Sequence, residues 1–135
     1  MMRLRQILLI DDNDIDNYIN RHILETNNVC DSIVTMISAI DALEYLNPIK
    51  DDPEKFPELI FLDIRMPLMD GFGFLDEFRN FPDGIKTSCI IYMLTSSQDG
   101  MDIQKAKTYP FVKEYLNKPL THQLVEQIFN LPPGE

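Results

Sequence analysis

The sequence lacks a long hydrophobic run and an excess of positive charge, and each absence excludes a class of protein. No apolar stretch among the 135 residues approaches the ~20 residues that a membrane span needs, so we expect no membrane insertion. The 12 lysines and arginines are outnumbered by 22 aspartates and glutamates, which gives a net charge of −10. Because phosphate backbones and anionic lipids would be repelled, we expect no binding to nucleic acid or to an anionic membrane surface.

Cysteine is scarce as well. The two cysteines, Cys30 and Cys89, form no C-x-x-C pair, and each lies beside or within an apolar run. This placement favours reduced core thiols over a disulfide or a metal site. A signal peptide is not expected either, because acids and not a small-residue cleavage site follow the short N-terminal apolar segment. We therefore expect a cytoplasmic location.

No linker, internal repeat or low-complexity tract interrupts the chain, whose length suits one domain with a single sizeable core. We expect that domain to occupy residues 1–131, followed by a C-terminal tail at 132–135 and by no output domain. The polar, proline-containing segment Lys50–Glu58 is predicted as a loop. It is either a partner-specific surface or a tolerated insertion.

Apolar runs that are typical of strands alternate with segments of helical period along the chain. Strands are predicted at Arg5–Ile10, Ser32–Ile37, Leu59–Leu62, Ser88–Leu94 and Phe111–Leu116. Helices are predicted at Asp14 to about Glu25, from Ser38 or Ala39 to Asn47, after Asp70-Gly71, within Asp99–Lys107, and from Leu120 to about Asn130. This alternation predicts an α/β fold with a parallel five-stranded sheet, arranged as a three-layer, doubly wound (βα)5 sandwich.

Polar residues follow four of the five predicted strands: Asp11-Asp12, Asp63, Thr95 and Lys118-Pro119. In open α/β sheets, ligands bind outside the carboxyl ends of the strands, which all meet at one rim. Each motif alone has an ordinary structural explanation, since paired acids cap helices and a single aspartate often forms a turn. Their joint occurrence at one rim favours a functional site.

The chemistry of this set is coherent. Clustered carboxylates repel one another unless a cation lies among them, and hard oxygen ligands favour Mg²⁺, with Mn²⁺ as a possible substitute. An ionised aspartate beside such a metal can attack phosphorus and form an aspartyl phosphate. A lysine and a hydroxyl group would help to neutralise the charge on the transferred phosphoryl group.

In their order and spacing, Asp11-Asp12, Asp63, Thr95 and Lys118-Pro119 resemble the receiver domain of two-component response regulators. The resemblance covers essentially the whole chain and includes the segment DIRMPLMDGFGFL after the third strand. It implies a flavodoxin-like sheet with strand order 2-1-3-4-5. It also implies a single-domain response regulator that is not an enzyme beyond its own phosphorylation and dephosphorylation. The phosphoryl donor would be a sensor histidine kinase or a histidine phosphotransfer protein, and an unknown downstream protein would respond to the phosphorylated form.

The resemblance also assigns roles at the site. Asp63 would accept the phosphoryl group, and Asp12 would be the main acidic ligand of Mg²⁺ with help from Asp11. Asp63 itself and the backbone carbonyl of Arg65 would complete the protein's share of the metal ligands. Lys118 would pair with the phosphoryl oxygens, and its peptide bond to Pro119 would be cis.

Two further roles concern the response to phosphorylation. Thr95 would move toward the phosphoryl group and make room for Tyr115 to turn inward. This movement would change the surface formed by the predicted helix within Asp99–Lys107, the strand Phe111–Leu116 and the last helix. Arg65 and Ser97 resemble positions that tune the phosphoryl lifetime, and we expect Arg65 to shield the group from water.

Two other functions remain open on the sequence alone. A small Mg²⁺-dependent phosphohydrolase would also use an aspartyl nucleophile, but such enzymes usually carry a second acid two residues later, where this chain has Arg65. A degenerate receiver that is never phosphorylated would be a binding module, although every matched site residue is intact.

Overall fold

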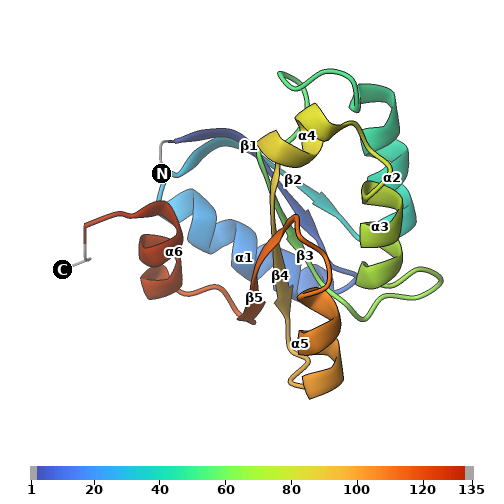
Figure 1. The fold of residues 1–135 in the computed structure, drawn as a ribbon. Helices are drawn as coiled ribbons and strands as arrows, with labels where there is room; N and C mark the ends of the chain where they lie inside the picture. The colour runs from blue at the N-terminus through green and yellow to red at the C-terminus, as the bar shows by residue number, and fades with distance from the viewer. Residues whose placement is uncertain (1–2, 133–135) are drawn as a thin grey trace.

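The chain forms one five-stranded parallel sheet with the strand order β2-β1-β3-β4-β5. Its structure is a computed structural model that describes residues 3–132, so all but the first residue of the expected tail at 132–135 lies outside the described residues. The strands are β1 (Leu4–Ile10), β2 (Cys30–Met36), β3 (Leu59–Leu62), β4 (Ile90–Thr95) and β5 (Val112–Asn117). The predicted fold class and sheet order are confirmed (Figure 1).

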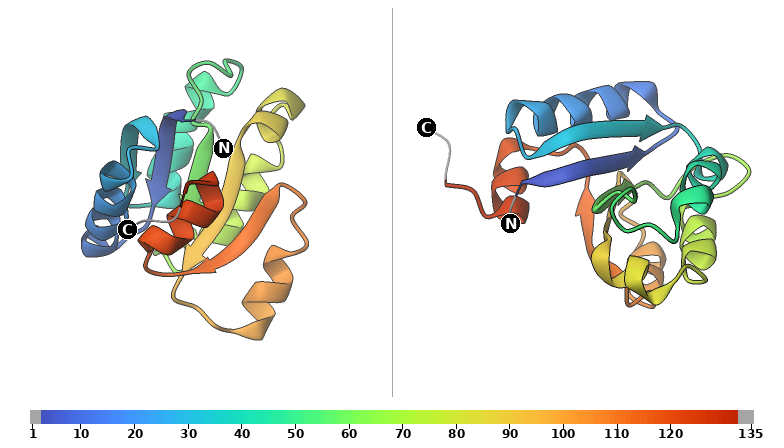
Figure 2. Two further views of the ribbon diagram at one scale, coloured as in Figure 1. Left: turned by 90° about the vertical axis from the view of Figure 1, so that its left-hand side faces the viewer. Right: turned by 90° about the horizontal axis from the view of Figure 1, so that it is seen from above.

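Helices cover both faces of the sheet and complete the three layers (Figure 2). The structure has α1 (Asp14–Thr26), α2 (Ala39–Leu46), the short 3₁₀ helix η1 (Asn47–Ile49), α3 (Gly71–Phe78), α4 (Asp83–Ser88), α5 (Gly100–Ala106) and α6 (His122–Phe129). Helices α1 and α6 lie on one face, and α2, α3, α4 and α5 lie on the other (Figure 1). None of the helices within residues 3–132 has the length and apolar character to cross a membrane.

The central strands are apolar throughout because both of their faces are buried. All four residues of β3 are buried, and alternate residues of β1 point to opposite faces. Ile7 and Leu9 join the core under α1 and α6, whereas Leu8 and Ile10 join the larger core under α2 and α3. Two packed cores therefore hold the rim of the sheet in a fixed shape.

Helix α4 was not predicted, and the fourth strand begins at Ile90 instead of Ser88. Glycine and proline both disfavour a helix, but the Pro82 carbonyl accepts hydrogen bonds from the backbone of Ile85 and Lys86 and thus starts a helical turn that includes Gly84. Ile85 is buried in the core and anchors this turn. Tertiary packing outweighs the weak local preference here.

The segment 50–58 lacks regular helix or strand, as predicted, but it is anchored to the core. Phe56 is fully buried and packs against Phe78 and Phe81. Arg5 Nη2 donates a hydrogen bond of 2.6 Å to the Phe56 carbonyl. The two cysteines are free thiols, with Cys89 buried and Cys30 half-buried.

Candidate functional site

The register of the sheet brings the polar strand ends together at one rim. Ile10 pairs with Leu62, and Leu62 pairs with Met93, so the residues that follow β1 and β3 leave the sheet side by side. Thr95 pairs with Asn117 at the ends of β4 and β5. The four sequence motifs therefore meet at the carboxyl edge of the sheet.

Lys118 forms the centre of this rim. Its Nζ lies 2.6 Å from Asp11 Oδ2 and 3.0 Å from Asp63 Oδ2. A third carboxylate, Asp16 Oδ2, lies 2.8 Å from the same nitrogen. The side chains of Lys118, Asp11 and Asp63 are at most 10% exposed, so these charges interact largely out of contact with water.

Asp16 is a site residue that the sequence analysis missed. It lies in the first turn of α1, where the Asn13 side chain caps the helix and accepts hydrogen bonds from the backbone of Ile15 and Asp16. This cap fixes the helix so that an acid in its first turn faces the rim. Asp16 belongs to the acid-rich segment DDNDID, but an acid in the first turn of a helix is common because of the helix dipole alone, so the sequence did not distinguish it as a site residue.

Three acids at the rim could hold a metal ion. Asp11, Asp12 and Asp63 each offer a carboxylate oxygen, and the three oxygens lie within 4.8 Å of one another. Asp12 is exposed, whereas Asp11 and Asp63 are buried. Oxygen donors of this kind suit a hard divalent cation such as Mg²⁺ or Mn²⁺.

Burial perturbs the titration of the groups at the rim. It raises the pKa of Asp11 from 3.8 to about 6, and the nearby charge of Asp63 adds to the rise, although hydrogen bonds from Lys118 and the Asn13 backbone oppose it. Burial would lower the pKa of Lys118, but its hydrogen bonds to Asp11, Asp16 and Asp63 outweigh burial and raise that pKa. Lys118 is therefore a permanent cation, and a further positive charge nearby would stabilise the ionised form of Asp11.

The loop after β3 is held by backbone hydrogen bonds. The Asp63 N–H donates to the Ile10 carbonyl at 3.0 Å, and the Ile64 N–H donates to Asp63 Oδ1 at 2.8 Å. The Gly71 N–H closes the loop on the Ile64 carbonyl at 2.8 Å. These bonds fix the Asp63 carboxylate at the rim.

Thr95, Ser97 and Tyr115 form a second group beside the acids. Thr95 is completely buried, its carbonyl accepts the Lys118 N–H at 3.0 Å, and its Oγ1 accepts the Ser97 N–H at 3.2 Å. The Tyr115 hydroxyl donates to the Ser97 carbonyl at 2.9 Å. The peptide bond between Lys118 and Pro119 is cis.

Arg65 and Ser97 converge on one carboxylate that the sequence analysis did not single out. Arg65 Nη2 donates to Asp102 Oδ2 at 2.5 Å, and Ser97 Oγ donates to the same oxygen at 2.8 Å. Asp102 lies on α5 and is buried. The expected roles of Arg65 and Ser97 in the phosphoryl lifetime stay predictions.

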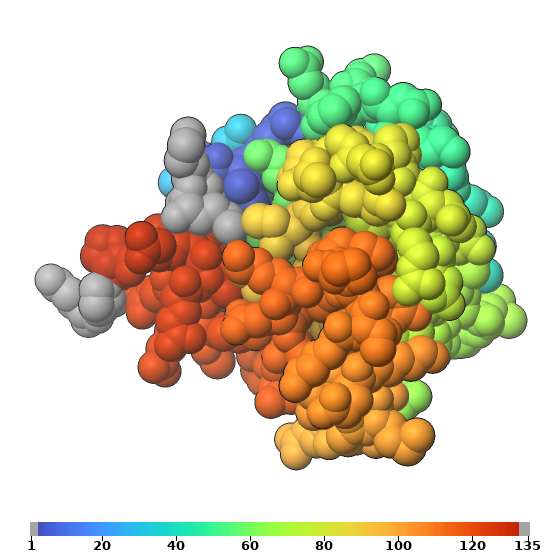
Figure 3. Space-filling view, viewed as in Figure 1, coloured from blue at the N-terminus to red at the C-terminus, as the bar shows by residue number. Residues whose placement is uncertain are grey.

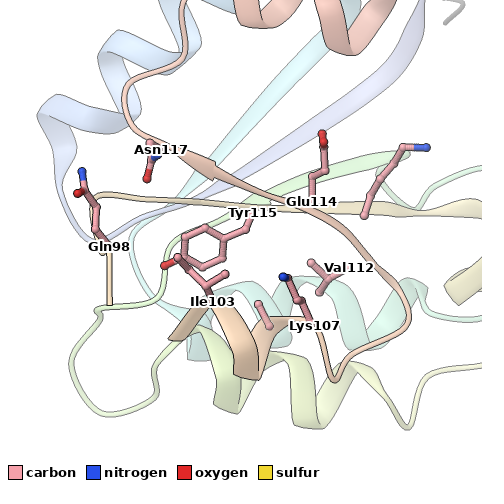
Figure 4. A pocket seen from close by; sticks show the side chains of 9 residues that line it. Gln98, Ile103, Lys107, Val112, Glu114, Tyr115 and Asn117 are labelled. Atoms are coloured by element: carbon pink, nitrogen blue, oxygen red, sulfur yellow. The ribbon is translucent and has the colours of Figure 1, made fainter. Parts of the chain in front are cut away.

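A groove with a volume of about 580 Å³ lies between α5 and β5. Its lining includes Ile103 and Lys107 of α5 and Val112 and Tyr115 of β5, and Figure 4 shows the Tyr115 ring beside Ile103 in this groove. In Figure 3, α5 and β5 together with α6 form the lower part of the visible face. The expected switch residue Tyr115 therefore contributes both to this surface and to the hydrogen-bond network at the rim.

Comparison with known proteins gives a consistent result. The family model of the response regulator receiver domain matches residues 7–130. An uncharacterised response regulatory protein of Staphylococcus epidermidis is 33% identical over 97 residues, which cover 72% of this chain and 35% of that protein. The sensor histidine kinase CheAY of Helicobacter pylori is 28% identical over 117 residues, which cover 85% of this chain and 14% of the kinase.

The fold has a close counterpart among solved structures. The crystal structure of a two-component response regulator from Cytophaga hutchinsonii matches with a TM-score of 0.85 and 31% identity, and the match covers 95% of this chain and 96% of that one. By contrast, this chain spans only about a third or less of the length of the two curated relatives named above.

Proposed function

Because the chain belongs to the response regulator receiver family, we propose that it accepts a phosphoryl group on Asp63 in two-component signalling. The observation that carries this proposal is the Lys118 ammonium group, held between the buried carboxylates of Asp63 and Asp11 at the rim of the sheet. A cation fixed beside a buried carboxylate nucleophile suits phosphoryl transfer, because the reaction concentrates negative charge on the phosphoryl oxygens.

In the proposed reaction an Asp63 carboxylate oxygen attacks the phosphorus of a phosphohistidine. The new P–O bond forms while the P–N bond breaks, and the electron pair of that bond returns to the imidazole nitrogen, which then takes up a proton. Lys118 exchanges part of its contact with Asp63 for the phosphoryl oxygens, and Thr95 turns its hydroxyl toward them. Because a carboxylate oxygen of Asp63 is itself the nucleophile, the attack needs no general base.

Asp11, Asp12 and Asp63, together with the Arg65 backbone carbonyl, would hold a divalent metal, for which we propose Mg²⁺. The fit rests on the three carboxylate oxygens that lie within 4.8 Å of one another and on the raised pKa of Asp11. When bound, Mg²⁺ supplies positive charge that neutralises the phosphoryl oxygens. Mn²⁺ could occupy the same ligands.

The response to phosphorylation would be a local rearrangement. We propose that Thr95 moves toward the phosphoryl group, that Tyr115 gives up its bond to the Ser97 carbonyl, and that its ring turns inward. Since Tyr115 lines the groove between α5 and β5, this rotation would change the surface that a downstream protein reads.

The partners follow from the same chemistry. A histidine kinase or a histidine phosphotransfer protein is the proposed donor, and the similarity of part of the kinase CheAY to this chain is consistent with such a pathway. The net charge of −10 supports protein contacts over nucleic-acid or membrane contacts, and we propose a cytoplasmic protein that catalyses only its own phosphorylation and dephosphorylation.

A single experiment separates this function from its alternatives. The protein is incubated with a small acyl phosphate and Mg²⁺, and its intact mass is compared with those of Asp63→Asn and of Asp83→Asn, which removes an exposed acid far from the rim. We expect the wild type and Asp83→Asn to gain one phosphoryl group and Asp63→Asn to gain none. Omission of Mg²⁺ should abolish the gain.

The other outcomes support the competing functions. No phosphoryl gain by the wild type with several donors would indicate a degenerate receiver that acts as a binding module. Fast multiple turnover on unrelated phosphoesters would indicate a phosphohydrolase and would contradict the proposal.

A further inference from the structure

The loop after Asp63 is tied to α5 by an ion pair that the proposed phosphoryl chemistry does not use. Arg65 and Asp102 are 37 residues apart in sequence, and their contact joins the β3–α3 loop to the first turns of α5. The Asp102 side chain is 13% exposed, whereas the Arg65 side chain is 63% exposed. The carboxylate is thus fixed in the protein, and the guanidinium group lies near the surface on a long, flexible side chain.

Asp102 also connects Arg65 to the switch residues. Its Oδ2 accepts the Ser97 hydroxyl at 2.8 Å, and the Ser97 carbonyl accepts the Tyr115 hydroxyl at 2.9 Å. Burial raises the pKa of Tyr115, and the hydrogen bond to Ser97 opposes this rise. A short hydrogen-bond network therefore runs from Arg65 in the β3–α3 loop through Asp102 of α5 and Ser97 to Tyr115.

Phosphorylation would add a strong competitor for Arg65. A phosphoryl group carries a charge of about −1.5 to −2 and three acceptor oxygens, against the single charge of Asp102. Arginine binds phosphate with two parallel hydrogen bonds and loses little hydration in doing so. Because Arg65 is only two residues from Asp63, a phosphoryl group on Asp63 forms within the region that its side chain can sample.

We propose that Asp102 is a positioning residue that holds the Arg65 guanidinium group on α5 until a phosphoryl group on Asp63 takes it over. The inference rests on the proposed function, since it requires that Asp63 be phosphorylated. After the exchange, Asp102 is a buried carboxylate that retains the Ser97 hydroxyl but has lost its cation. A buried charge without its cation is unfavourable, so the first turns of α5 loosen when Asp63 is phosphorylated.

The test measures the affinity for fluoroberyllate, a phosphoryl mimic, in the presence of Mg²⁺. Asp102→Asn keeps the size of the side chain and its bond to Ser97 but removes the charge that retains Arg65. We expect this variant to bind the mimic about two- to fivefold more tightly than the wild type, the range that the loss of a partly exposed ion pair allows. Asp102→Glu, which restores the charge, should return the affinity toward the wild-type value.

Two controls show whether Arg65 mediates the effect. Asp99→Ser removes one charge from the same end of α5 but keeps a side chain that can cap the Met101 N–H, and its affinity should equal that of the wild type. In an Arg65→Ala background, Asp102→Asn should give no gain at all, because no guanidinium group remains to be released. Hydrogen exchange in residues 100–106 should become faster when the wild type binds the mimic, but should not respond to the mimic in Arg65→Ala.

Each outcome is decisive. The inference is wrong if Asp102→Asn and Asp99→Ser bind the mimic equally tightly, or if Asp102→Asn still raises the affinity in the Arg65→Ala background. In either case the wild type still binds the mimic, so the proposed function stands. If the wild type binds no fluoroberyllate, the proposed function fails and the inference fails with it.

Discussion

At the scale of single residues, the site depends on charge compensation in a buried setting. Lys118 contacts three carboxylates, and two of them, Asp11 and Asp63, are almost completely shielded from water. One ammonium group does not neutralise three acids, so the rim retains negative charge that a divalent metal would balance. Asp11, whose pKa is raised to about 6, is the residue at which this imbalance can be measured.

Asp11 makes the stability of the metal-free protein depend on pH. Between its ordinary pKa of 3.8 and its raised pKa of about 6, the folded protein keeps a proton that the unfolded chain loses. As the pH rises through this window, the free energy of unfolding therefore falls. At pH values above the window the whole loss, up to about 3 kcal/mol, is present. Urea unfolding without metal should show Asp11→Asn gaining stability relative to the wild type between acidic and neutral pH.

The effect of Mg²⁺ on the free energy of unfolding tests the same assignment. It should stabilise the wild type more at neutral than at acidic pH, because at acidic pH it must displace the proton from Asp11. In Asp11→Asn this pH dependence should be much weaker. A stability difference between the two proteins that is the same at both pH values would contradict the assignment of the raised pKa to Asp11.

The residues of the site differ in how far sequence could predict them. Asp63, Thr95 and Lys118 are recognisable because each follows an apolar run at a strand end. Asp16 and Asp102 are acids on helices, and their contacts with Lys118 and Arg65 exist only after the helices have packed on the sheet. Acids in the first turn of a helix are common for reasons of the helix dipole alone, so their positions carried no distinguishing signal.

At the scale of elements, the start of α3 packs closely against the backbone of Asp63. Gly71 is the first residue of α3, and its N–H donates to the Ile64 carbonyl. A Cβ at this position would collide with the Asp63 carbonyl and lie 3.0 Å from Ile64 Cα. Since both neighbours are backbone atoms, neither can rotate away, and only glycine permits this approach.

Gly71→Ala should therefore affect both the fold and the site. We expect a loss of about 1–3 kcal/mol in the free energy of unfolding, because the backbone near Asp63 must shift to relieve the collision. The rate of phosphorylation by an acyl phosphate should fall as well, because Asp63 moves relative to Lys118. Urea unfolding and time-resolved intact mass measure the two effects.

Gly84→Ala in α4 is the matched control, since a Cβ there meets nothing within 4 Å. Replacement of an exposed helical glycine by alanine should stabilise the protein by about 0.5–1 kcal/mol and leave the phosphorylation rate unchanged. If both glycine variants have the same stability and the same rate, the close approach at Gly71 has no functional importance.

Most elements could be predicted from the sequence because each strand is a distinct apolar run and most helices have a clear period. Helix α4 could not, since its six residues include a glycine and directly follow Pro82. Its stability comes from Ile85, which is buried in the same core as Phe74 and Phe78 of α3. A helix of this length has too few internal hydrogen bonds to be indicated by local preference alone.

At the scale of the whole molecule, the alternation of strands and helices predicted a three-layer sandwich, but it did not determine the order of the strands. That order came from the resemblance to receiver domains, and the structure confirms it. The order places β1 between β2 and β3, so that Asp11 and Asp63 leave adjacent strands and Lys118 reaches both from beyond β4. The site is thus a consequence of the topology and not of any single segment.

The identity of the phosphoacceptor is tested by locating the phosphoryl group on the chain. The protein is treated with an acyl phosphate and Mg²⁺, and borohydride then reduces the aspartyl phosphate to an alcohol, which converts that aspartate into homoserine. Tandem mass spectrometry of the peptides should find homoserine at position 63 and at no other aspartate. Homoserine at position 11 or 12, or its absence from every peptide of a chain that has bound Mg²⁺, would contradict the assignment of Asp63 as the phosphoacceptor.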